Sequence, residues 1–142
     1  MTGTSRGATL RRAIETCIHP DDGAIAQLGE LFHDDVTVWS PNMLAIGLAD
    51  LAENLAFREL AFSDVEVQID ALHVFANKGF AEFRVAATFS GPFVIGKETV
   101  IEPNGQKILL GAAVIADFEG GKIKALRAYF DDATLLEQML PA

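Results

Sequence analysis

A cation, a phenol and a carboxylate stand at every second position near the end of the chain. They are Arg127, Tyr129 and Asp131, in the segment that follows the Gly120–Gly121 turn. Side chains alternate between the two faces of a strand, so these three share one face. The other face carries only apolar side chains, namely Leu126, Ala128 and Phe130. If the polar face borders a pocket, it can orient and protonate a small molecule; if it faces water, it is ordinary surface.

The chemistry that suits this arrangement is proton transfer. A carboxyl group among apolar side chains loses hydration, which raises its pKa and fits it for general acid–base catalysis. On this hypothesis Asp131 is the acid and base, Tyr129 donates a hydrogen bond to a bound carbonyl, and Arg127 sets the charge of Asp131. The alternative is that Asp131 caps the terminal helix. The sequence leaves both roles open.

Five further residues are candidates for contact with a substrate. Trp39 and Asn42 flank Ser40 and Pro41 at a strand end, a place that often lines the mouth of a pocket. The other three stand at inward-facing strand positions, and they are His73, Phe83 and Phe89. Structural roles compete with this interpretation, because Trp39 and His73 also suit a core and asparagine also stabilises turns.

Composition narrows the classes of partner. The chain has 142 residues, half of them hydrophobic, and a net charge of −9. This acidic balance opposes nucleic acid, whose phosphates bind lysine and arginine. No apolar run approaches the roughly 20 residues of a membrane span. We therefore expect neither a nucleic-acid nor a membrane partner.

Cysteine, histidine and glycine usage bears on compartment and cofactors. Cys17 is the only cysteine, which excludes an intramolecular disulfide and fits a reducing cytoplasm. The first twenty residues lack the apolar block of a secretory signal, so we expect a cytoplasmic protein. The three histidines have no metal-ligand spacing, and the glycines follow turns rather than a phosphate-binding pattern. No metal and no cofactor are expected.

Helical periodicity marks the first half of the chain. We expect residues 1–8 to form a flexible tail, before a single domain over residues 9–142. Apolar spacing predicts a helix from Thr9 to the His19–Pro20 dipeptide and a second from Asp21 or Asp22, with Phe32 on its buried stripe. A third helix should begin near Asp50, where Asp50 and Glu53 have capping-box spacing, and carry Phe62.

Alternating periodicity marks the second half. One strand places Val65 and every second residue up to Phe75 on one face, and it returns through Phe80–Ser90. The stretch Ile108–Phe118 is almost continuously apolar, which predicts cover on both of its faces. A short helix over Thr134–Leu140 follows the final strand.

These elements predict an α+β fold, with helices gathered on one side of a strongly curved antiparallel sheet and a pocket on its concave side. A strand that is apolar on both faces in so small a domain also predicts a second subunit. We expect a homodimer formed through the sheet.

Five segments carry a resemblance to a known family: Leu31–Val36, Ala61–Val65, Thr88–Phe93, Pro103–Lys107 and Arg127–Asp131. In this order they resemble the SnoaL-like polyketide cyclases, within the superfamily of nuclear transport factor two and ketosteroid isomerase. The resemblance implies a cone-shaped, cystatin-like curved sheet wrapped around N-terminal helices. It also implies an aspartate acting as acid and base at the position of Asp131. Many of these cyclases carry a histidine where this chain has Phe89.

Two functions follow as expectations. The first is binding of a small apolar carbonyl-containing molecule in the pocket, with cofactor-independent acid–base catalysis of the cyclase, isomerase or dehydratase type. The second is a non-catalytic ligand-binding or protein-interaction module of the same fold, which the replacement of the histidine by Phe89 favours.

Overall fold

The computed structural model describes residues 5–95 and 98–141. Its elements, in chain order, are α1 (Arg6–Ile18), α2 (Asp22–Ala26), α3 (Leu28–Leu31), β1 (Phe32–Ser40), β2 (Met43–Ile46), α4 (Leu48–Phe57), β3 (Phe62–Phe75), β4 (Lys78–Phe89), β5 (Phe93–Ile95), β6 (Thr99–Ile101), β7 (Lys107–Glu119), β8 (Lys122–Tyr129) and α5 (Asp132–Met139). None of the helices in this described part is long and apolar enough to cross a membrane.

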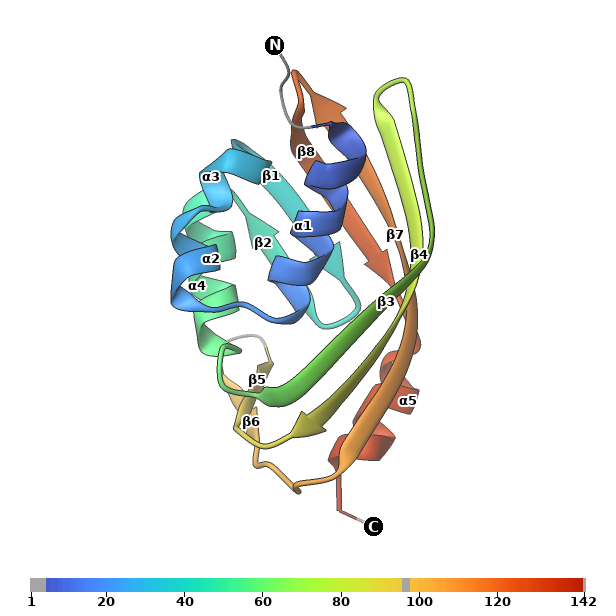
Figure 1. Cartoon of the computed structure of the whole chain (residues 1–142). Coiled ribbons are helices and arrows are strands. Elements are labelled where there is room, and N and C mark those ends of the chain that lie inside the picture. The colour runs from blue at the N-terminus through green and yellow to red at the C-terminus, as the bar shows by residue number, and fades with distance from the viewer. Residues whose placement is uncertain (1–4, 96–97, 142) are drawn as a thin grey trace.

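A curved six-stranded sheet organises the fold, as predicted. Its strand order is β2-β1-β8-β7-β4-β3, and it bends around α1 while α2, α3 and α4 gather beside β1 and β2 (Figure 1). Neighbouring strands are antiparallel except β1 and β8, which run parallel. The strands β5 and β6 form a separate pair. The antiparallel expectation therefore holds for every pair of the large sheet but one.

The first helix begins earlier than predicted. Ser5 is its N-cap, and the Ser5 hydroxyl accepts a hydrogen bond from the backbone N–H of Ala8 at 3.1 Å. The expected tail over residues 1–8 is thus wrong from Arg6 onward, because a serine cap satisfies the first turn. Residues 1–4 lie outside the described residues. The helix ends at Ile18, two residues before Pro20, as the proline predicts.

Two other helix predictions need correction. The second predicted helix is divided into α2 and α3, and Phe32, placed on its stripe, instead opens β1 as a buried strand residue. The helix expected from Asp50 begins at Leu48 with Gly47 as its N-cap, so the capping box does not form there. The Asp50 carboxylate instead accepts from the backbone N–H of Ile46 at 2.9 Å. Phe62 belongs to β3.

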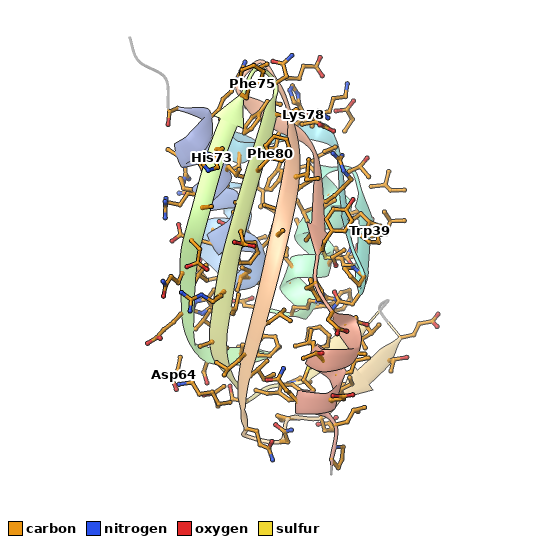
Figure 2. All side chains as sticks on the ribbon, turned by 90° about the vertical axis from the view of Figure 1, so that its right-hand side faces the viewer. Trp39, Asp64, His73, Phe75, Lys78 and Phe80 are labelled. Atoms are coloured by element: carbon orange, nitrogen blue, oxygen red, sulfur yellow. The ribbon has the colours of Figure 1, made fainter. Side chains whose placement is uncertain are left out.

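A β-bulge changes which residues of β3 face inward. Ile69 pairs with Phe83 and Ala71 with Glu82, so Asp70 is an extra residue opposite β4. Beyond it, Leu72 packs against the core while His73 and Phe75 are exposed. Figure 2 shows both on the outer face of the sheet. The predicted single face from Val65 to Phe75 is therefore wrong after the bulge.

Two apolar clusters form the core. The larger lies between α1 and the sheet and includes Leu10, Ile14 and Phe83, whereas the smaller gathers Phe89 and Phe93 with Leu135 of α5. The inward-facing positions predicted for Phe83 and Phe89 on β4 are confirmed, since both are buried together with Ala81 and Ala87 at alternate positions. Within the described chain the outer face of β7 is only partly covered, because Leu109 there is 62% exposed. The second subunit expected on this face stays a prediction.

Candidate functional site

A largely apolar cavity of about 170 Å³ lies between the end of α1 and the inner face of the sheet. The apolar wall comes from α1, β1, β4, β7 and β8, and it includes Ile14, Val38, Phe83, Val85, Ala112, Leu126, Ala128 and Phe130. Among the described residues that line it, none is an aspartate, a glutamate, a histidine or a tyrosine. A general acid or base therefore does not lie on the wall itself.

One end of the cavity is polar, and Arg58 dominates it. Arg58 is the C-cap residue of α4, which aims its side chain into the cavity wall. Its guanidinium donates from Nη2 to the Asn42 carbonyl at 2.7 Å and from Nη1 to Asn42 Oδ1 at 3.0 Å, while Nε donates to the Val94 carbonyl at 3.3 Å. The guanidinium carbon also lies 4.5 Å from the centre of the Phe93 ring. Arg58 is thus fixed by neutral acceptors and an aromatic face.

Asn42 joins this cation to a carboxylate. Its Oδ1 accepts from Arg58 and from the Ser40 hydroxyl, at 3.0 and 3.1 Å, and its Nδ2 donates to Asp132 Oδ1 at 3.3 Å. Asp132 is the first residue of α5. Because the amide stands between the two charged groups, Asp132 compensates Arg58 only at a distance.

Burial controls the titration of the two ionisable groups on the wall. Desolvation lowers the pKa of Arg58 to about 10, against the opposing effect of the Asp132 charge, so Arg58 is a cation at neutral pH. Desolvation raises the pKa of the Cys17 thiol to about 12. Cys17 keeps some accessible surface because it lines the cavity, yet its thiol is neutral and not an activated nucleophile.

A shallower depression of about 520 Å³ adjoins the polar end. It shares Trp39, Ser40 and Asn42 with the inner cavity. The β1–β2 turn therefore borders both the cavity and the depression.

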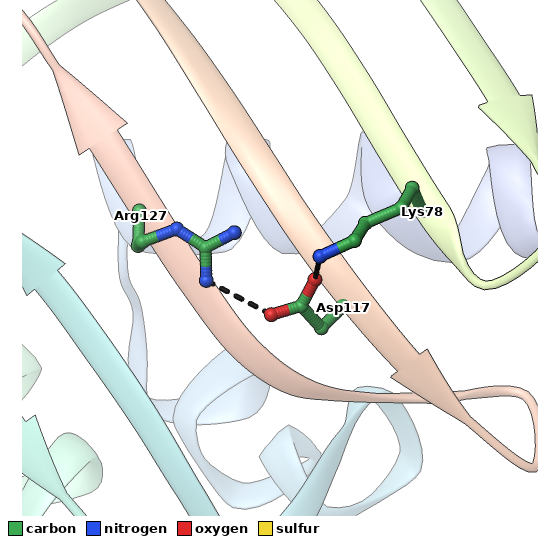
Figure 3. Close-up of polar contacts among 3 residues, drawn as sticks. All are labelled: Lys78, Asp117 and Arg127. Atoms are coloured by element: carbon green, nitrogen blue, oxygen red, sulfur yellow. Dashed lines mark hydrogen bonds and ion pairs between the residues drawn. The ribbon is translucent and has the colours of Figure 1, made fainter.

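The predicted catalytic residues lie elsewhere. Arg127 donates from Nη1 to Asp117 Oδ2 at 2.9 Å on the outer face of the sheet, where Lys78 also pairs with Asp117 (Figure 3). These partners, Arg127 first, lower the pKa of Asp117. Tyr129 is 46% exposed and packs on Trp39, with 5.4 Å between ring centres.

Asp131 is the N-cap of α5. Its Oδ1 accepts from the Thr134 backbone N–H at 3.2 Å and its Oδ2 from the Thr134 hydroxyl at 2.9 Å. The expectation that Arg127, Tyr129 and Asp131 face a pocket is wrong, because the apolar alternate residues of β8 take the inner face. The capping role is the alternative that the structure supports.

The predicted substrate contacts divide into two groups. Trp39, Asn42 and Phe83 line the cavity. Phe89 does not; it is fully buried in the smaller core cluster. His73 is wrong as a pocket residue, because the bulge at Asp70 turns it to the outer face.

The sequence analysis did not identify Arg58, the residue that dominates the polar end of the cavity. Arg58 has no motif around it, and its acceptors lie 16 and 36 residues away in the chain. Asp132 directly follows Asp131 in the sequence and carries no motif of its own. Among the described residues, no three histidine, cysteine, aspartate or glutamate side chains come together as metal ligands would.

A family model described as SnoaL-like polyketide cyclase matches residues 8–139. The comparison with curated proteins finds no match.

Solved structures share the fold at low identity. A putative SnoaL-like polyketide cyclase from Jannaschia sp. CCS1 aligns with a TM-score of 0.81 and 16% identity over 100% of both chains. A protein with a ketosteroid isomerase-like fold from Catenulispora acidiphila, in complex with trimethylamine, aligns with a TM-score of 0.73 and 16% identity over 97% of this chain and 96% of its own. IdmH, a putative polyketide cyclase from Streptomyces antibioticus, aligns with a TM-score of 0.71 and 14% identity over 95% and 98%.

Proposed function

This chain belongs to the SnoaL-like polyketide cyclase family, and from that premise we propose that it binds a small apolar carbonyl-containing molecule in the cavity behind the β1–β2 turn. The observation that carries the proposal is the single polar end of an otherwise apolar cavity. Arg58 and Asn42 stand there, and the opposite walls are aliphatic and aromatic. Pockets that bind small organic molecules have this character: an apolar lining with a few placed polar groups.

Cavity size limits the ligand. An apolar protein cavity of about 150 Å³ holds benzene, so a cavity of about 170 Å³ accepts one ring with a short substituent. The carbonyl oxygen would accept from Arg58, whose guanidinium has donors without a partner among the described residues. Three of its five N–H groups are used by Asn42 and Val94.

Titration with phenylacetone, a benzene ring carrying a short ketone, tests the proposal. We expect saturable binding by calorimetry, with NMR shifts centred on residues of the cavity wall. Ala112→Leu fills part of the cavity from β7 and should weaken binding about tenfold or more, since overpacking costs about 1–3 kcal/mol. Ala49→Leu adds the same atoms at an exposed position of α4 and serves as the control. Absence of saturable binding, or equal affinities for the two variants, would reject the proposal.

Acid–base catalysis is the second candidate, and family membership favours it. A general base must reach the substrate within hydrogen-bond distance or through one water. Asp132 is the carboxylate connected to the cavity, through Asn42. Incubation of phenylacetone with the protein in heavy water distinguishes catalysis from binding alone. Catalysis would accelerate deuterium uptake at the carbon atoms next to the carbonyl group. Asp132→Asn would abolish that acceleration.

A further inference from the structure

Arg58 carries a partly buried charge, and no charged side chain in the described part of the chain contacts it. All three of its hydrogen bonds go to neutral oxygens, two on Asn42 and one on Val94. It forms no ion pair with any residue in the described part of the chain, whereas exposed arginines such as Arg84 do. The Asp132 carboxylate accepts from the side-chain amide of Asn42, and the described residues include no hydrogen bond between Asp132 and Arg58.

The positive charge of Arg58 is only partly compensated by its neighbours. Buried charges in proteins are normally paired, because desolvation of an isolated ion is costly. Carbonyl dipoles and the Phe93 ring compensate part of that loss, and one N–H on each terminal nitrogen remains without a partner among the described residues. Each of these donors can form a charge-assisted hydrogen bond with a carboxylate oxygen.

We propose that the cavity selects a small monocarboxylate, with the carboxylate on Arg58 and a single apolar ring or short chain against the aromatic and aliphatic wall. The inference rests on the proposed function, because it concerns the same cavity, and it adds the charge of the ligand. A phosphate is the poorer match, since one guanidinium offsets one negative charge and the chain as a whole carries a net charge of −9.

Three ligands of nearly equal shape test whether the charge of the ligand determines its affinity. They are phenylacetate, phenylacetamide and phenylacetone. All carry the same ring and carbonyl, and only phenylacetate is ionised at neutral pH. We expect the full chain to bind phenylacetate about tenfold or more tightly than phenylacetamide at low salt, because hydrogen bonds between charged groups are roughly twice as strong as neutral ones. This comparison uses the unaltered protein, so it does not depend on whether any variant folds.

Variants then locate the preference. Arg58→Met should remove the advantage of phenylacetate over phenylacetamide, whereas Arg58→Lys keeps the charge and should retain part of it. Arg84→Met is the matched control, because Arg84 pairs with Asp70 on the outer face of the sheet. It should leave the preference unchanged.

The outcomes distinguish the two proposals. Equal affinities for phenylacetate and phenylacetamide would overturn the inference and leave the proposed function standing if phenylacetone binds. A preference for phenylacetate that persists in Arg58→Met would also overturn it, because the anion would then bind elsewhere. Failure of phenylacetone alone would overturn the proposed binding of a neutral carbonyl compound, whereas failure of all three ligands would overturn the inference as well.

Discussion

Asp131 acts on stability through the helix that it caps. Asp131→Ala removes the acceptor for the Thr134 N–H and hydroxyl, so the melting temperature should fall by a few degrees. Asp131→Asn keeps a capping oxygen and should stay close to wild type. Both variants should bind phenylacetone with unchanged affinity, because this side chain lies outside the cavity. Thermal unfolding followed by circular dichroism, with calorimetric titration, measures the two effects; weaker binding with intact stability would contradict the capping role.

The same cap depends on pH. The hydrogen bonds from Thr134 lower the pKa of Asp131 below its ordinary value of 3.8. A carboxyl whose pKa is lowered in the folded state stabilises the protein above the unfolded pKa, and that contribution is lost as pH falls through the folded value. The melting-temperature difference between wild type and Asp131→Ala should therefore be steady near neutral pH and shrink below about pH 3.8.

Asp131 and Arg58 also show what sequence can reveal about single residues. Alternation groups Arg127 and Tyr129 on one side of β8, whereas Asp131 lies beyond the end of the strand as the N-cap of α5. A period of two does not say which side of the strand is inner. In the structure the apolar alternate residues Leu126 and Ala128 line the cavity, so theirs is the inner side. The position of Arg58 depends on contacts with Asn42 and Val94 that only the folded chain creates.

Strands and helices could be predicted where the apolar side chains keep one regular spacing along the sequence. The parity of β4 follows from its alternation and is correct throughout. The parity of β3 fails at Asp70, because one inserted residue reverses every later side chain and leaves no clear mark in the sequence. Pairing of β1 with β8 was equally hidden, since it joins segments such as Val38 and Leu126 that are far apart in the chain.

Gly91 holds two chain segments together next to the cavity. Its backbone N–H donates to the Ala61 carbonyl at 3.0 Å, and a Cβ at this position would lie 1.9 Å from the Leu60 carbonyl oxygen. Gly91→Ala must push the backbone ahead of β3 aside, so we expect the free energy of unfolding to fall by about 2 kcal/mol or more. Urea unfolding measures this change.

Gly111→Ala is the matched control for that substitution. No atom lies within 4 Å of the position that a Cβ would take at Gly111, on the outer face of β7. Its free energy of unfolding should stay within about 0.5 kcal/mol of wild type. Similar losses in both variants would mean that close approach to Leu60 is not what requires a glycine at residue 91.

At the scale of the whole molecule, the two faces of the sheet differ in what covers them. Helix α1 and the core cover the inner face, whereas the outer face keeps apolar side chains at the surface. Phe80 is 44% exposed and Leu109 is 62% exposed. Leu109 pairs with Ala86 of β4, whereas the charged side chains of Glu82 and Arg84 lie between Leu109 and Phe80. The α+β architecture was predictable from periodicity, but the sequence alone could not distinguish a strand covered twice from one left open.

We propose that a second copy of the chain covers this outer face. An apolar patch on one sheet can meet its own copy about a twofold axis, which buries the same residues on both subunits.

Leu109→Lys would then place two cations in one apolar interface and should shift the protein from dimer to monomer. Light scattering coupled to size-exclusion chromatography measures this mass, and Leu60→Lys, at a 75% exposed position in the segment between α4 and β3, is the control. The backbone bonds between Leu109 and the Gln138 amide do not involve the altered side chain, so the fold should persist. A wild-type protein that is monomeric at micromolar concentration would refute the proposal.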